Sequence, residues 1–150
     1  MKIIFVCSGN TCRSPMAECA FEEMLREEGV TGVEVESRGV VANVGAPISE
    51  NARKALENAE IPIKEHVATQ ITTDDILASD FVICMTERHK MRLGNLPKVF
   101  TLGQMTGCGD IVDPYGKDEA TYRECLSEIL SALNKLMPII KRQLALRNQQ

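Results

Sequence analysis

Residues 2–18 read KIIFVCSGNTCRSPMAE: an apolar run, a loop of small and polar residues, and the first turns of a helix. The β-branched and aromatic side chains of 2–7 predict a buried strand. Ser14 and Pro15 suit the N-cap and the first position of a helix, and Glu18 would then lie in its first turn, where the helix dipole favours an acidic side chain. A strand, a short loop and a helix form the first unit of an α/β fold.

The rest of the chain repeats this alternation. Further strands are expected at 33–37, 81–85 and 98–101, and further helices at 49–59, 73–78, 87–93 and from about Asp118. Four glycines and a proline within 103–117 predict a loop. Pro138 is expected to kink the last helix or end its regular part, and Ile140 and Leu144 indicate that helix resumes beyond it. We therefore expect one α/β domain over residues 1–150, with a four-stranded parallel sheet and helices on both faces. Ligands of such sheets bind beyond the carboxyl ends of the strands, which is where Cys7 lies.

The composition is that of a soluble protein: of 150 residues, 44% are hydrophobic and 25% are charged, and the net charge is −4. This charge argues against non-specific attraction to nucleic acid or an anionic membrane. No apolar stretch is long enough for a membrane span or a signal peptide, so we expect a cytoplasmic, monomeric protein with reduced cysteines. With no C-x-x-C pair and only His66 and His89, neither a structural zinc site nor a cofactor is expected.

The loop between the first strand and the first helix has the features of an anion-binding site. Its small residues let successive N–H groups point inward as a nest, and the following helix adds its positive dipole end. Arg13 can hold two phosphate oxygens with its planar guanidinium, and the same charge stabilises a thiolate nucleophile at Cys7. On the Cys-x5-Arg spacing alone, a buried strand-end thiol beside a solvated arginine is an equally good explanation. The residues expected around a phosphate are Cys7, Ser8, Gly9, Asn10, Thr11, Cys12 and Arg13.

The longer string VCSGNTCRSPMAE, residues 6–18, is far more specific. It resembles the signature of the low-molecular-weight protein tyrosine phosphatase family, Val-Cys-x-Gly-Asn-x-Cys-Arg-Ser-Pro near the N-terminus. Ser37, His66 and the Asp-Pro-Tyr sequence at 113–115 fall where this family has a supporting serine, a structural histidine and an acid loop. The similar segments together span most of the chain.

The resemblance implies a cysteine-dependent protein phosphatase that forms a phosphocysteine intermediate. Cys7 would be the nucleophile, and Arg13 would hold the phosphate through the transition state. Asp113 would protonate the leaving group and then activate the hydrolytic water, a role that typically accelerates a reaction about 10²–10⁴-fold. The nearby alternatives for this acid are Asp110, Asp118 and Glu119.

Four further residues are implied as supports of the loop. Asn10 would be held in a strained left-handed conformation by partners that include Ser37 and His66, and asparagine tolerates this conformation better than most residues. Ser14 would donate a hydrogen bond to the Cys7 sulfur, beyond or instead of capping the helix. Capping or turn formation alone would also explain the two serines, and a purely structural role is expected for His66.

Thr11 favours phosphoarginine as the substrate. The chain is most similar to a bacterial branch of the family that acts on phosphoarginine in proteins and has threonine here, whereas the tyrosine phosphatases usually have an aliphatic residue. A small side chain with a hydroxyl suits a polar guanidinium better than an apolar ring. Phosphotyrosine is the alternative, and Tyr115 could stack on either group. The expected partners are phosphorylated proteins, with phosphate or a similar oxyanion in the loop, and neither nucleic acid nor a membrane.

Two other functions compete with this interpretation. An arsenate reductase would need two further cysteines, and Cys84 has no second cysteine within the next ten residues. A redox sensor or phosphate-binding module without turnover would not need both Arg13 and Asp113. Redox chemistry could still regulate the enzyme. Cys7 and Cys12 are close enough in a curled loop for a reversible disulfide, which we predict after exposure to peroxide.

Overall fold

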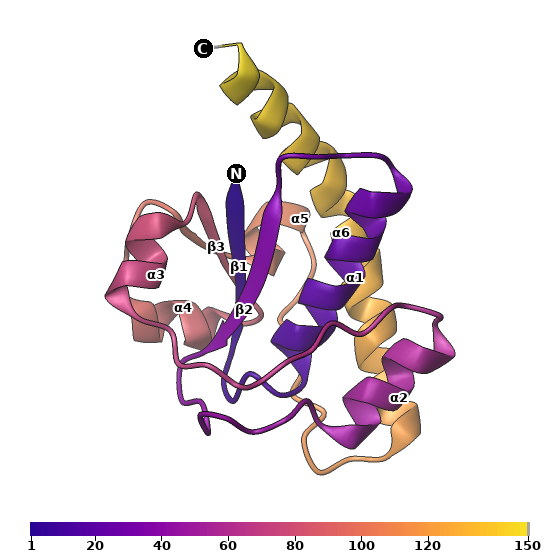
Figure 1. Ribbon diagram of the computed structural model, residues 1–150. Helices are drawn as coiled ribbons and strands as arrows, with labels where there is room; N and C mark the ends of the chain where they lie inside the picture. Colours follow the sequence, from indigo (N-terminus) through magenta and orange to yellow (C-terminus); the bar gives the residue numbers. More distant parts are fainter. Residues whose placement is uncertain (150) are drawn as a thin grey trace.

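The sheet lies between two layers of helices in the computed structural model, which describes residues 1–149 (Figure 1). Its strands are all parallel in the order β2-β1-β3-β4, with bounds β1 (Lys2–Cys7), β2 (Glu34–Gly39), β3 (Phe81–Cys84) and β4 (Val99–Thr101). The central strand β1 places Cys7 beside Gly39 of β2 and Val6 beside Cys84 of β3. The predicted fold class is confirmed; β1 has the predicted bounds, and the other strands differ by one or two residues at an end.

Helices cover both faces of the sheet, as predicted. One face carries α1 (Arg13–Glu27), α2 (Glu50–Asn58), α5 (Leu102–Thr106) and α6 (Glu119–Asn148), and the other carries α3 (Thr73–Ala78) and α4 (Glu87–Leu93) (Figure 1). Alternate residues of a strand face opposite ways, so the core divides in two. Ile3, Phe5 and Cys7 belong to the larger cluster with α1 and α6, whereas Ile4 and Val6 belong to the smaller one with α3 and α4. Burial on both faces explains why β1 is apolar almost throughout.

The first helix begins earlier than the sequence predicts. Its N-cap is Cys12, and Arg13 is already helical. Ser14 is therefore not the N-cap, and its hydroxyl instead contacts the Cys7 sulfur. Glu18 is also displaced from the first turn and is buried within a polar network. Both side chains have polar partners away from the helix end: Ser14 contacts Cys7 and Asn10, and Glu18 binds Ser37 and Lys64.

One prediction for the second half of the chain is wrong. Residues 102–106 form the short helix α5 inside the predicted loop, because Thr101 and Gln104 make a capping box in which each side chain bonds the other's backbone N–H. The last helix includes Pro138 and continues to Asn148, so helix is present beyond the proline, as expected. Buried apolar side chains on either side of the proline hold both parts of α6 against the core.

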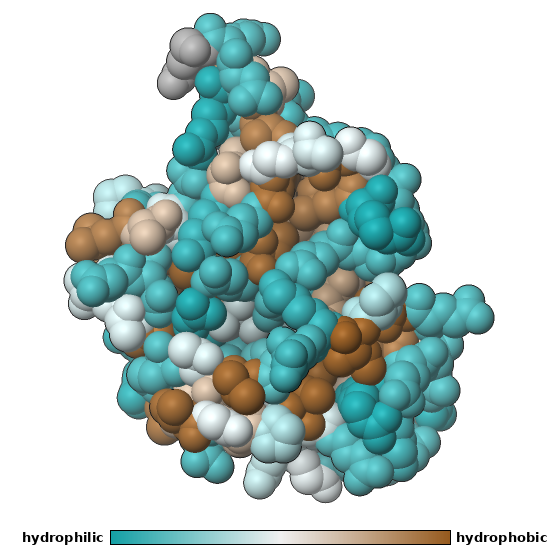
Figure 2. Space-filling model, in the orientation of Figure 1, coloured by the Kyte–Doolittle hydropathy of each residue, from teal (hydrophilic) through white to brown (hydrophobic). Residues whose placement is uncertain are grey.

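The face shown in Figure 2 is mostly hydrophilic, and its apolar side chains lie in several places, including the hollow between β2 and α1 and the loop that follows β2. Val41 and Val44 of this loop are exposed. They stand at the carboxyl edge of the sheet, beside the loop of residues 8–12. Among residues 1–149, no helix combines the length and apolar character that a membrane span requires.

Candidate active site

The loop of residues 8–12 joins the end of β1 to the start of α1 and packs directly on the end of β2. A Cβ added to Gly39 would lie 2.6 Å from the Ser8 carbonyl oxygen and 3.0 Å from the Asn10 backbone nitrogen. Both neighbours are backbone atoms, so only a glycine leaves room for this approach. The neighbouring strand thus fixes one side of the loop.

Asn10 organises the interior of the loop. It is fully buried, and its φ of 59° lies in the left-handed region. Its side-chain nitrogen donates to Ser14 Oγ and Ser37 Oγ, both at 2.9 Å, and its Oδ1 accepts from the Thr69 backbone N–H at 2.9 Å. The Nε2 of His66 donates to the Asn10 carbonyl oxygen at 2.6 Å. The structure therefore brings all the predicted supports of Asn10 to it, and adds Thr69, for which the sequence carries no signal.

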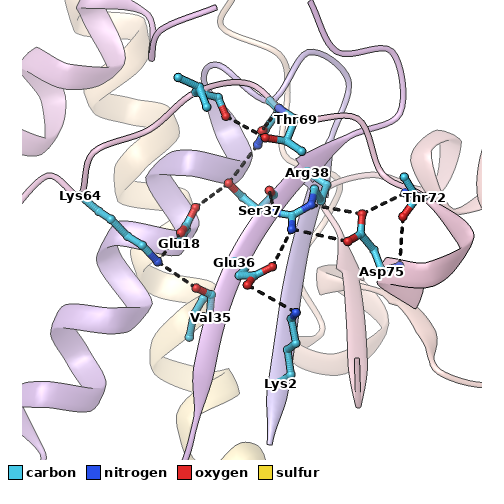
Figure 3. A network of polar contacts seen from close by, with 12 residues as sticks. Lys2, Glu18, Val35, Glu36, Ser37, Arg38, Lys64, Thr69, Thr72 and Asp75 are labelled. Atoms are coloured by element: carbon cyan, nitrogen blue, oxygen red, sulfur yellow. Dashed lines mark hydrogen bonds and ion pairs between the residues drawn. The ribbon is translucent and has the colours of Figure 1, made fainter. Parts of the chain in front are cut away.

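A buried carboxylate sets the direction of these hydrogen bonds (Figure 3). Ser37 donates its hydroxyl hydrogen to Glu18 Oε1 at 2.6 Å, which leaves the Ser37 oxygen free to accept from Asn10. Lys64 Nζ pairs with Glu18 at 2.8 Å and with Glu22 at 2.6 Å. Burial opposes the charge of Lys64, but its bonds to the two carboxylates prevail and raise its pKa. The charge on Glu18 is thereby paired, and the chain of bonds runs from it to the loop.

The Cys7 sulfur lies 2.9 Å from Ser14 Oγ. Since the Ser14 oxygen accepts from Asn10, its hydroxyl hydrogen is available to the Cys7 sulfur or to the Arg38 carbonyl oxygen at 3.3 Å. A thiolate would be the stronger acceptor of the two, because charge-assisted hydrogen bonds are the strong ones. The Ser14 hydroxyl is therefore placed to donate to the Cys7 sulfur.

Arg13 is buried and held from several sides. Its Nη1 donates to the Ile111 carbonyl oxygen at 2.9 Å, and its Nη2 lies 3.4 Å from Ser8 Oγ and 3.5 Å from Asp113 Oδ2. Asp113 is half exposed and accepts a hydrogen bond from the Tyr115 backbone N–H at 3.1 Å. The segment after α5 thus brings the predicted acid beside the predicted phosphate-binding arginine.

The alternative carboxylates of this segment have other contacts. Asp110 accepts a hydrogen bond from the first backbone N–H of α4 at 3.1 Å. Asp118 is the N-cap of α6, and Glu119 pairs with Lys54 at 3.0 Å. Of the four candidate acids, only Asp113 lines the pocket that also holds the cysteine.

This pocket has a volume of about 560 Å³. Cys7, Thr11 and Arg13 lie in its wall together with Asp113, and Ser8, Gly9 and Cys12 complete the contribution of the loop. Tyr115 and Val41, with 75% and 61% of their surfaces exposed, form an apolar rim. A sulfur nucleophile, a guanidinium and a carboxylate therefore converge on one cavity that is large enough for a side chain of another protein.

The other cysteines differ from Cys7 in their surroundings. Cys12 donates to Ser49 Oγ at 3.2 Å, and its sulfur lies 3.3 Å from the Tyr122 hydroxyl. Burial raises the pKa of Tyr122 to about 12, and the hydrogen bond with Cys12 adds to this effect. Burial also raises the pKa of Cys84 and of Cys125 to about 12, so both are neutral core thiols at ordinary pH.

A larger and more open hollow, of about 980 Å³, lies at the opposite edge of the sheet, near the strand starts and the end of α6. Two of its charged groups, Asp80 and Arg147, pair with each other at 2.7 Å. None of the described residues that line it is a cysteine, serine or histidine. The smaller pocket is therefore the one equipped for nucleophilic chemistry.

Comparison with known proteins points to the same chemistry. A family model described as low molecular weight phosphotyrosine protein phosphatase matches residues 2–147. The chain is 37% identical over 149 residues to a protein-arginine-phosphatase of Bacillus subtilis, covering 95% of this chain and 98% of that protein. It is 36% identical over 141 residues to the low molecular weight protein-tyrosine-phosphatase PtpB of Staphylococcus haemolyticus, covering 91% and 97%. A solved structure of the arginine phosphatase YwlE, a mutant with a phosphorylated active-site serine, matches with a TM-score of 0.88 at 36% identity, covering 94% and 96%.

Proposed function

Because this chain belongs to the low molecular weight phosphotyrosine protein phosphatase family and is therefore a protein phosphatase, we propose that it hydrolyses phosphoarginine in proteins through a phosphocysteine at Cys7. The convergence of Cys7, Arg13 and Asp113 on one pocket is the observation that carries the proposal. In this proposal residues 1–150 act as one phosphatase domain, and every reacting group except water and substrate comes from the chain.

In the first step the Cys7 thiolate attacks the phosphorus atom. A sulfur–phosphorus bond forms while the bond from phosphorus to the guanidinium nitrogen breaks, and its electron pair leaves with the nitrogen. Backbone N–H groups of the loop, the N-terminus of α1 and Arg13 stabilise the charge on the phosphoryl oxygens. The bond from Arg13 Nη1 to the Ile111 carbonyl fixes the guanidinium plane and leaves the rest of the fork for phosphate.

Asp113 moves the protons in both steps. It first gives its proton to the departing nitrogen, so that the arginine side chain leaves as a guanidinium cation, which is general acid catalysis. It then takes a proton from the water that attacks phosphorus, while the sulfur–phosphorus bond breaks and inorganic phosphate forms. Ser14, 2.9 Å from the sulfur, stabilises the thiolate that this second step restores at Cys7.

Thr11 supports phosphoarginine as the substrate. It lines the pocket, and its Oγ1 lies 3.7 Å from the position that a Cβ atom would take if Gly9 had a side chain. A hydroxyl in the pocket wall can accept a hydrogen bond from a guanidinium N–H, and the Asp113 carboxylate that remains after proton transfer attracts the departing guanidinium cation. Similar proteins named as protein-arginine-phosphatases agree with this choice.

Phosphotyrosine is the second candidate. The exposed rim formed by Tyr115 and Val41 offers an apolar surface on which a phenol ring could pack. Similar proteins include tyrosine phosphatases such as PtpB. The two candidates share all the chemistry at phosphorus and differ only in what the pocket wall recognises.

A Thr11→Ile variant separates the two substrates. The parent should have the higher kcat/KM on a phosphoarginine peptide than on the same peptide with phosphotyrosine. Thr11→Ile should lose or reverse this preference, because isoleucine removes the hydroxyl and adds apolar volume. Equal preference in the two proteins would remove the case for arginine. In a Cys7→Ser control, hydrolysis of both peptides and of a chromogenic aryl phosphate should stop.

We also propose redox regulation at the same loop. Peroxide would oxidise the Cys7 thiolate to a sulfenic acid, and the Cys12 thiol would then displace water from it to form a disulfide. The cytoplasm, where we propose that the protein acts as a monomer, would supply thiols to reverse this bond. Treatment with peroxide and then thiol should restore less activity in Cys12→Ser than in the parent. Equal recovery would contradict this role of Cys12.

A further inference from the structure

A buried histidine outside the proposed mechanism is joined to the phosphate-binding loop. His89 of α4 is only 3% exposed. Its Nε2 lies 2.9 Å from Ser8 Oγ, and its Nδ1 lies 3.0 Å from Thr86 Oγ1, so both ring nitrogens are hydrogen-bonded. Ser8 follows Cys7 directly and lines the pocket. The contact joins residues 81 positions apart, so the fold and not the local sequence creates it.

The bonds of Thr86 determine which ring nitrogen carries the hydrogen. Thr86 is the N-cap of α4, and its Oγ1 accepts the His89 backbone N–H at 3.3 Å. Within residues 1–149, the His89 Nδ1 is the one acceptor in reach of the Thr86 hydroxyl hydrogen. In the other tautomer Nδ1 would itself donate to Thr86 Oγ1, and the Thr86 hydroxyl hydrogen would have no acceptor among these residues. A neutral His89 therefore carries its hydrogen on Nε2 and donates it to Ser8 Oγ.

The surroundings keep the ring neutral. Burial lowers the pKa of His89 to about 4, and the positive charge of Arg13 acts in the same direction. Arg88 also opposes protonation, whereas Asp113 and Asp110 favour it. At neutral pH the ring is thus an uncharged group with a single donor.

This arrangement fixes the role of the Ser8 hydroxyl. Its oxygen accepts from His89 Nε2 at 2.9 Å and from Arg13 Nη2 at 3.4 Å. These two bonds use both lone pairs of the oxygen, so the hydroxyl hydrogen is what Ser8 can offer to the pocket. With the opposite tautomer, Ser8 would give this hydrogen to the ring and turn a lone pair toward an incoming anion.

We propose that His89 is a positioning residue of the active site, which holds Ser8 as a hydrogen-bond donor to a phosphoryl oxygen and, through Ser8, steadies the guanidinium of Arg13. The inference rests on the proposed phosphatase function. Preorganised donors act most strongly where charge develops in the transition state, so the contribution of His89 falls on kcat more than on KM.

Two amide variants of His89 test this role. In His89→Gln the side-chain nitrogen reaches about as far as Nε2 and still donates to Ser8, whereas His89→Asn is one methylene shorter and does not reach it. On an aryl phosphate, kcat should stay within about threefold of the parent in His89→Gln and fall about tenfold or more in His89→Asn, with a smaller change in KM. Inhibition by inorganic phosphate should weaken little in His89→Gln and more in His89→Asn.

A double-mutant cycle with Ser8→Ala separates positioning from a structural role. If His89 acts through Ser8, adding His89→Asn to Ser8→Ala causes no further loss of kcat. Parent-like turnover in His89→Asn, equal losses in the two amide variants, or losses that multiply in the double variant would each overturn the inference. Turnover by Cys7→Ser would refute the phosphatase mechanism itself. An inactive Cys7→Ser beside a fully active His89→Asn would refute only the role of His89.

Discussion

In an Asn10→Ala variant the loop loses three side-chain hydrogen bonds, the buried ones to Ser14 and Ser37 and the half-buried one to Thr69, while its backbone must keep a φ of 59°. Each such bond contributes about 1 kcal/mol net. Alanine in the left-handed region costs roughly 1 kcal/mol more, since it lacks the tolerance of asparagine for this conformation. The variant should therefore be about 4 kcal/mol less stable than the parent, a large fraction of the roughly 5–15 kcal/mol that stabilises a typical domain.

Asn10→Gly is the matched control, because glycine loses the same bonds and accepts the positive φ. It should be about 1 kcal/mol more stable than Asn10→Ala. Urea unfolding measures both differences, and hydrolysis of an aryl phosphate measures the state of the loop. Both variants should lose most of their kcat/KM, since Ser14 and Ser37 no longer have their donor. If the free energy of unfolding of Asn10→Ala lay within about 1 kcal/mol of that of the parent, and kcat/KM were unchanged, the organising role of Asn10 would be refuted.

Gly39→Ala should lower stability by about 1–3 kcal/mol and reduce kcat/KM, because the new Cβ would lie 2.6 Å from the Ser8 carbonyl oxygen; parent-like unfolding and turnover would show that the loop has room. The pKa of His89 is lowered from 6.5 to about 4, so an unfolded chain binds a proton between these values and the folded one does not. The free energy of unfolding should therefore fall as the pH drops through this window, by up to about 3 kcal/mol. In His89→Gln, which lacks the imidazole, urea unfolding should show a weaker dependence of this free energy on pH. The same dependence in the variant and the parent would show that His89 is not its cause. Iodoacetamide at neutral pH should leave Cys84 and Cys125 unmodified in the folded protein, because burial raises the pKa of each thiol to about 12. Peptide mass spectrometry measures the modification, and labelling of either cysteine before unfolding would contradict its being a buried, neutral thiol.

The fold could be predicted because its central elements are long enough to show a pattern. The apolar run of β1 and the periodic helices around it indicate a parallel sheet with little ambiguity. The helix α5 escaped this reasoning, since it has only five residues and lies among glycines that indicate a loop. Its one local signal is the spacing of Thr101 and Gln104, which form the capping box.

The loop of the candidate site could be identified in the sequence because Cys7 and Arg13 belong to one contiguous string. Contacts between residues far apart in the sequence could not be predicted in this way. From the sequence, Glu18 looks like an acidic residue near the start of a helix. In the fold its carboxylate instead accepts a hydrogen bond from Ser37 of β2. The contact of His89 depends on β3 lying beside β1, which brings the start of α4 to the loop. A single histidine in a short helix gives no sign of this.

The covalent step through Cys7 can be observed in an Asp113→Asn variant. With an aryl phosphate whose leaving group needs no proton, attack by Cys7 should proceed, whereas hydrolysis should be slow without the carboxylate that activates water. Rapid acid quenching followed by peptide mass spectrometry should then find one phosphoryl group on Cys7. Release of phosphate with an unmodified Cys7, or with the phosphoryl group on a different residue, would contradict the mechanism.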